Sequence, residues 1–353
     1  GKFFLSDLIK SFSVTDLKKF FSSLDLDIVS KDGYLYPRSM QASSVLNALL
    51  TELEYMGVNF IFSRAVKSVS LPETNSVLVN SEDGEKSFED TFDSVIISTG
   101  LGAGEFNIKT GKKVYPDCNG MFVSFPGIFQ SALLPALCGL KCIEDITSIA
   151  GVRAKGRVTL YSDGEYLGND EGEIQFTKEC ISGIPVFQVS RQASIYLDEG
   201  RQVSAVLDML PEYSDEELSD ILACRIRKHP DRKIYEILAG LLYDKLLKFI
   251  YLKSGISGRD MVIDIPGEKR NAFIHNCKNL EFKITGTVNK EKAQTMCGGI
   301  GLENVTPNLE LKSKSGVYVT GELINIDGKC GGYNLYLAWA TGLRAGKAAA
   351  LHV

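Results

Sequence analysis

Residues 317–350 have the sequence VYVTGELINIDGKCGGYNLYLAWATGLRAGKAAA, which combines a short strand, two tight turns and a helix. The apolar run at 317–320 predicts the strand, and Gly321 lets the backbone turn sharply at its end. Glu322 then follows the carboxyl end of a strand, the edge at which α/β sheets bind ligands. The segment therefore predicts an α/β fold with a ligand site at this edge.

The second turn, at Asp327 and Gly328, leads to a glycine pair at the start of the predicted helix over about 332–350. Glycines such as Gly331 and Gly332 leave the backbone N–H groups of a helix start exposed, and the helix dipole there favours negative charge. The pattern predicts an anion-binding helix start. A plain turn followed by close helix packing is the competing interpretation.

Composition limits the class of protein. The chain has 353 residues, of which 44% are hydrophobic and 24% charged, which is typical of a globular protein with two or three domains. Lys and Arg total 39 against 44 Asp and Glu, which argues against nucleic acid as a partner. The sequence has no apolar run long enough for a membrane span and no signal-peptide pattern. These features predict a cytoplasmic protein with no nucleic-acid partner and no membrane partner.

Cysteine and histidine usage argues against a metal centre. The chain has 8 cysteines with no C-x-x-C spacing, and only 3 histidines, His229, His275 and His352. Zinc sites need paired ligand spacings, and disulfide frameworks are typical of much smaller chains. We therefore predict no metal site and interpret the cysteines as packed thiols.

The first hundred residues alternate between helical and strand patterns. Ser13 and Asp16 form a capping box before one helix, and a second helix is expected over 42–56. Strands are expected at 58–62, 65–71 and, as a buried run ending at Gly100, at 92–99.

Short β-prone runs at 156–162, 172–177 and 203–210 then predict a small sheet or barrel. A second capping box, Ser214 with Glu217, opens a helical cluster. The change of pattern predicts one domain interrupted by another. In this division, 1–123 and 283–353 form the first domain, and 124–282 is an insert, β-rich over 124–212 and helical over 213–260.

Residues 321–342 closely follow the motif G-E-x-x-D-x-D-G-x-C-G-G-Y-N-x-Q-x-A-x-x-S-G, with departures that include Asn325 in place of Asp and Tyr336 in place of Gln. Further blocks match in the same order at 32–49, 172–191 and 292–300. On these motifs the chain resembles bacterial FAD-dependent oxidoreductases of the aminoacetone-oxidase-like or bile-acid-reductase-like kind.

The resemblance implies a Rossmann-like FAD-binding domain carrying a long inserted domain that is barrel-like and helical. It implies an enzyme that passes hydride from NADH or NADPH through FAD to a small organic substrate. Tyr333 and Asn334 are the expected catalytic residues. The residues expected to bind the cofactor are Thr99, Gly100, Gly321, Glu322, Asp327, Gly328, Gly331, Gly332, Tyr333, Asn334 and Leu335.

Such proteins open with a strand, a G-x-G-x-x-G turn and a helix, and no segment here fits that pattern. The run GLGAG at 100–104 follows a strand, but Glu105 breaks the glycine spacing and no helix pattern follows. We therefore expect the FAD-binding domain to be incomplete at its N-terminus. The alternative is a non-catalytic ligand-binding or scaffolding paralogue that has lost the ability to bind the dinucleotide.

Overall fold

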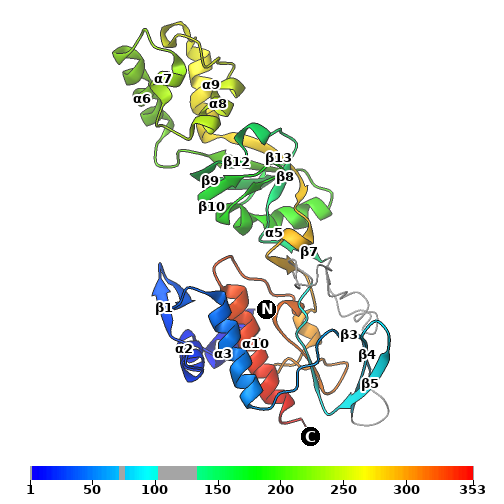
Figure 1. Cartoon of the computed structure of the whole chain (residues 1–353). Coiled ribbons are helices and arrows are strands. Elements are labelled where there is room, and N and C mark those ends of the chain that lie inside the picture. The colour runs from blue at the N-terminus through cyan, green and yellow to red at the C-terminus, as the bar shows by residue number, and fades with distance from the viewer. Residues whose placement is uncertain (1, 71–75, 102–132, 353) are drawn as a thin grey trace. The chain divides into compact units, whose positions relative to one another are not determined.

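The computed structural model describes residues 2–70, 76–101 and 133–352 (Figure 1). The chain divides into two compact units. Within the described residues, unit 1 comprises 2–70, 76–101 and 298–352, and unit 2 comprises 133–297. The predicted domain boundary at 123/124 lies outside the described residues. The other predicted boundary, 282/283, falls inside strand β13 (Leu280–Thr287), and the domain assignment stays a prediction.

Unit 1 is a mixed α/β unit. Its helices and strands are α1 (Lys2–Ser11), α2 (Val14–Ser23), β1 (Ile28–Lys31), β2 (Tyr34–Pro37), α3 (Ala42–Tyr55), β3 (Ala65–Ser70), β4 (Val77–Glu82), β5 (Ser87–Phe92), β6 (Val95–Ile97), β15 (Val317–Val319) and α10 (Tyr333–Ala349). β6 and β15 pair in parallel, with Val317 opposite Val95, although they lie far apart in the sequence. The predicted strand and helix at the C-terminal end are therefore confirmed.

Local signals explain the helices of this unit. The Ser13 hydroxyl accepts a hydrogen bond from the Asp16 N–H, and the Asp16 carboxylate accepts one from the Ser13 N–H, so the predicted cap of α2 is confirmed. α10 packs through Leu337 and Ala340 against Leu8 of α1. The strand predicted at 58–62 is wrong, because this run pairs with no strand among the described residues.

Unit 2 contains a closed barrel in the order β10-β11-β8-β13-β12-β9. The strands besides β13 are β8 (Leu140–Cys142), β9 (Arg153–Ser162), β10 (Glu165–Phe176), β11 (Ile181–Ser182) and β12 (Val203–Asp208). Side chains alternate between buried and partly exposed along β12, as expected when one face of a strand lines a core. Leu160, Ile174 and Phe282 are fully buried in that core. The predicted β-rich segment thus forms a barrel, in a sheet separate from β6 and β15.

Helices cover the rest of unit 2: α5 (Ile184–Asp198), α6 (Asp215–Lys228), α7 (Ile234–Leu238), α8 (Asp244–Lys253) and α9 (Gly267–Lys278). The sequence prediction missed α5, which lies within the segment taken as β-rich. Its buried residues Val186, Val189 and Ala193 recur at helical spacing, and Gly183 precedes them with a φ of 102°. α9 extends the helical part beyond 260, where the prediction ended.

Smaller elements complete unit 2. A two-stranded antiparallel ribbon joins β7 (Leu134–Ala136) to β14 (Thr295–Cys297), and a 3₁₀ turn, η1 (Thr147–Ile149), follows β8. None of the helices in the described parts of the chain is long and apolar enough to cross a membrane.

Candidate functional site

The carboxyl ends of β6 and β15 lie side by side in unit 1. The Thr320 N–H donates to the Ile97 carbonyl at 3.1 Å, and the Thr320 and Ser98 hydroxyl oxygens are 2.8 Å apart. These contacts continue the parallel pairing past the last strand residues. They place two predicted pairs of site residues, Thr99–Gly100 and Gly321–Glu322, at the same sheet edge.

Gly100 and Glu322 contact each other at this edge. Gly100 has a φ of +66°, and a Cβ added there would lie 3.4 Å from Oε2 of Glu322. Glu322 is half-buried in the 3₁₀ turn η5 (Gly321–Leu323), three residues beyond the end of β15. The N–H of Gly321 donates to the buried Thr341 hydroxyl of α10 at 2.9 Å, which fixes the turn against the helix. The structure therefore holds a carboxylate against a glycine backbone at the strand ends.

The glycine pair at the start of α10 adopts conformations that other residues rarely adopt. Gly331 has a φ of +127° and Gly332 a φ of +89°. A Cβ on Gly331 would lie 2.7 Å from Cε1 of Tyr34. A Cβ on Gly332 would have no atom of the described residues within 4 Å, apart from its neighbours along the chain. The backbone at Gly332 therefore borders open space. The sequence reasoning gave no site role to Tyr34, although its block at 32–49 carried the resemblance.

Asn334 holds the preceding turn. Its Oδ1 accepts from the Gly328 N–H at 2.7 Å, and its Nδ2 donates to the Gly328 carbonyl at 3.1 Å. This pair of bonds ties the 327–328 turn to the first turn of α10. It supports a positioning role for Asn334, and a catalytic role stays a prediction. Tyr333 and Leu335 are each 60% exposed beside it.

A second glycine pair supports the loop that follows Glu322. Gly298 and Gly299 have φ values of +105° and +114°, and a Cβ on Gly299 would lie 2.6 Å from the Leu323 carbonyl oxygen. The next residue, Ile300, donates its N–H to the same carbonyl at 2.8 Å. This pair was visible in the sequence block at 292–300, but its contact with Leu323 was not.

Burial raises the pKa values of two side chains near the start of α10. Burial raises the pKa of the Cys330 thiol, so this group stays protonated at neutral pH, as the packed-thiol interpretation expects. Burial also raises the pKa of Tyr336. The Tyr336 hydroxyl donates to the Phe12 carbonyl, and its ring stacks on Phe12. Tyr336, which departs from the family motif, therefore joins α10 to the end of α1.

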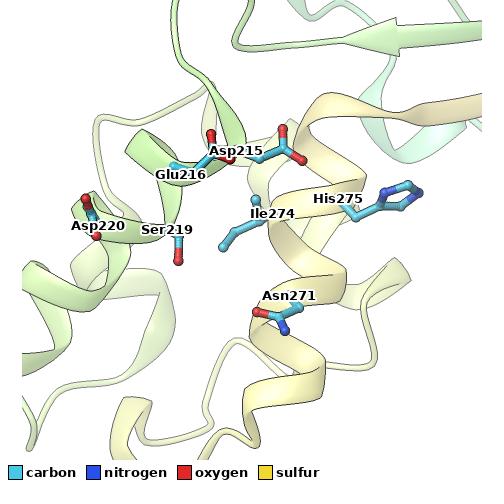
Figure 2. A pocket seen from close by; sticks show the side chains of 7 residues that line it. All are labelled: Asp215, Glu216, Ser219, Asp220, Asn271, Ile274 and His275. Atoms are coloured by element: carbon cyan, nitrogen blue, oxygen red, sulfur yellow. The ribbon is translucent and has the colours of Figure 1, made fainter.

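Unit 2 contains an acidic cavity of about 410 Å³ between α6 and α9. Asp215 and Glu216 lie in the first turn of α6, where the helix dipole favours carboxylates. In Figure 2 the His275 ring points to the side opposite Asp220. No group of three His, Cys, Asp or Glu residues within the described ranges could hold a metal ion. The helix dipole accounts for Asp215 and Glu216 in the lining of this cavity.

Known proteins resemble the chain over most of its length. A "3-dehydro-bile acid delta(4,6)-reductase" of Clostridium scindens is 33% identical over 350 residues, which cover 98% of this chain and 83% of that protein. A "Ribosomal RNA dihydrouridine synthase" of Escherichia coli is 23% identical over 341 residues, covering 90% and 76%. A protein of the same name from Haemophilus influenzae is 25% identical over 197 residues, which cover 56% of this chain and 46% of that protein.

The family described as "HI0933-like protein Rossmann domain" matches residues 1–348. This match and the Clostridium relative confirm the resemblance inferred from the motifs, and they support a Rossmann-like domain and an oxidoreductase. The chain belongs to the HI0933-like family of bile-acid-reductase-like flavoproteins.

Proposed function

We propose that this chain carries the flavin-binding and substrate-binding parts of an FAD-dependent oxidoreductase that takes hydride from NADH or NADPH. The observation that carries the proposal is the edge formed by β6, β15 and α10. There the Glu322 carboxylate lies against Gly100, and the positive-φ Gly332 borders open space at a helix start.

The residues at this edge fit a flavin. Glu322 supplies a carboxylate that accepts hydrogen bonds from ribityl hydroxyls. The N–H groups at the start of α10 suit the ring edge that becomes negatively charged on reduction. FAD, when bound, accepts a hydride and passes it to an acceptor. Asn334 keeps the 327–328 turn in place, and Tyr333 is exposed where it could contact the flavin or the substrate.

Exposed apolar surface in unit 1 supports a further part of the proposal. Parallel sheets are normally covered on both faces, yet β6 and β15 form a two-stranded parallel sheet in which Ile96 is 38% exposed. α3 buries none of its residues against the rest of the described chain, and Leu46 is 56% exposed. We propose that further elements of the same domain, a strand, a G-x-G-x-x-G turn and a helix, cover these surfaces.

The proposed substrate class rests on the reaction that the name of one relative describes and on the reactivity of a flavin. The name of the Clostridium relative describes reduction of double bonds in a 3-dehydro-bile acid. A flavin delivers hydride well to a carbon–carbon double bond conjugated to a ketone. We therefore propose a small conjugated unsaturated ketone as the acceptor for this chain.

The test uses the purified protein. The expected preparation is yellow and releases FAD on denaturation. Under anaerobic conditions it should oxidise NADH or NADPH faster when a conjugated unsaturated ketone is added than when its saturated analogue is. Ribosomal RNA is tested as the alternative acceptor, because two of the relatives are named as ribosomal RNA dihydrouridine synthases. A colourless protein that takes up no added FAD would overturn the proposal and favour the non-catalytic paralogue.

A further inference from the structure

A second cavity, of about 620 Å³, lies in unit 2 between α8 and the segment that joins β8 to η1. Its volume falls in the range of small-molecule sites, roughly 300–1,000 Å³. No residue of the proposed flavin site lines it. The lining residues, called the α8 groove below, are Glu144, Asp145, Ser148, Lys245, Lys248, Phe249, Leu252 and Lys253.

One wall of the α8 groove is cationic. Lys245 and Lys248 lie three residues apart on α8, so their side chains share one face of the helix. Both are exposed, and neither has an ion-pair or hydrogen-bond partner in the part of the chain that the structure describes. Lys253 differs, because its Nζ donates to the Glu281 carbonyl at 3.1 Å.

The opposite wall carries two carboxylates that other groups already occupy. Both oxygens of Glu144 accept from the Lys283 N–H, at 3.1 and 3.0 Å. Oδ1 of Asp145 accepts from the hydroxyl and the N–H of Thr147, at 2.6 and 2.9 Å. These bonds fix both carboxylates in the loop before η1, and neither carboxylate forms an ion pair with Lys245 or Lys248 within the described residues.

The α8 groove also has two apolar lining residues, Phe249 and Leu252. The Phe249 ring is half-buried and stacks on Phe282, with centroids 6.3 Å apart and an interplanar angle of 15°. Leu252 remains 53% exposed beside it. Stacking on Phe282 holds the Phe249 ring in place, so the lining of the groove includes a fixed apolar surface as well as two ammonium groups.

We propose that the α8 groove binds a small amphipathic anion. The apolar body of the ligand lies on Phe249 and Leu252, and its carboxylate, sulfonate or phosphate lies between Lys245 and Lys248. The apolar contact supplies affinity that is independent of charge, and the two ammonium groups select an anion over its neutral isostere. This site is distinct from the proposed flavin site and does not depend on it.

The test compares two probes of the same shape on the full chain, naphthalene-2-sulfonate and the neutral naphthalene-2-sulfonamide. Exposed ion pairs contribute about 0.2–1 kcal/mol each, so two lysines should favour the sulfonate by about two- to thirtyfold in calorimetric titration. This preference should shrink at high salt because screening weakens charge contacts at a surface. Lys245→Gln/Lys248→Gln should remove it without changing the thermal midpoint.

The matched control is Lys178→Gln/Lys228→Gln, which removes the same charge from exposed positions elsewhere in unit 2 and should keep the preference. As a second readout, the sulfonate should slow the acetylation of Lys245 and Lys248, but not of Lys178, in residue-resolved mass spectrometry. Equal affinity for the two probes would overturn the proposal. An equal loss of preference in both double variants, or no protection of Lys245 and Lys248, would overturn it as well.

Discussion

Alanine substitutions at Gly331 and Gly332 should separate a structural glycine from one that a ligand needs. Both have positive φ values, +127° and +89°, which cost an alanine about 1–3 kcal/mol of backbone strain. Gly331→Ala also brings a Cβ to 2.7 Å from Cε1 of Tyr34, and this adds at most about 1 kcal/mol, because Tyr34 is 45% exposed and its ring can move. The free energy of unfolding should therefore fall by about 1–4 kcal/mol for Gly331→Ala and about 1–3 kcal/mol for Gly332→Ala.

The effect on flavin binding should follow the opposite order. The Cβ added by Gly332→Ala enters the open space beside the helix start, where the proposed flavin approaches the backbone. Losing a hydrogen bond to a charged group costs about 1.5–3 kcal/mol, so flavin affinity should fall about ten- to hundredfold. Gly331→Ala points its Cβ at Tyr34, and it should weaken flavin binding only as far as it weakens folding.

The assay measures both quantities on the same preparations. Urea denaturation of the apo-protein gives stability, and quenching of flavin fluorescence gives affinity at a temperature where every variant is folded. Gly164→Ala is the matched control, because Gly164 has a φ of +83° with open space in the β9–β10 turn of unit 2 and is not a residue of the proposed flavin site. Tyr34→Ala should restore part of the stability lost in Gly331→Ala. Wild-type flavin affinity in Gly332→Ala would refute the reasoning.

Three further perturbations test the structure. Glu322→Gln should weaken flavin affinity about tenfold or more while leaving the urea midpoint near that of wild type, and an unchanged affinity would remove Glu322 from the site. Lys278→Met breaks a shielded ion pair with Asp208, 2.8 Å long, and should cost about 3–5 kcal/mol in urea denaturation; a loss below about 1 kcal/mol would contradict this. Burial raises the pKa of Cys277 from 9.0 to about 12, so the protonated thiol favours the fold, and this contribution should be lost as pH rises from about 9 towards 12. Alkylation at pH 8 should therefore label the exposed Cys224 and spare Cys277 until the protein unfolds.

Local sequence signals predicted the parts of the fold that depend on neighbours along the chain. Ser13 with Asp16 and Ser214 with Glu217 form the expected capping boxes, because each bond spans three residues. The strands β9 and β10 followed from short β-prone runs. The closed barrel could be named only as one alternative, because closure depends on pairing between β8 and β13, which lie far apart in the sequence.

The candidate site shows the limit of sequence reasoning most clearly. Gly100 and Glu322 both lay in expected turns, but their contact depends on the parallel pairing of β6 with β15. The approach of Tyr34 to Gly331 joins segments nearly at opposite ends of the chain, and no local pattern encodes it. Residue types and turns can be predicted from sequence, whereas the long-range contacts that assemble them cannot.

The start of α10 leaves room for a ligand. α2 and α6 begin with serine caps, in which a side chain satisfies backbone N–H groups. α3, α5, α8, α9 and α10 begin without a side-chain cap, and α5 and α10 follow a positive-φ glycine.

At α5 the reason is packing, since a Cβ on Gly183 would lie only 2.2 Å from the Glu173 carbonyl oxygen. At α10 no such neighbour exists within the described residues, because Gly332 faces open space. Glycine is itself a favoured N-cap and costs a helix little relative to serine. The open space at this helix start leaves room for an anionic ligand, which would supply the partner that a side-chain cap supplies at α2 and α6.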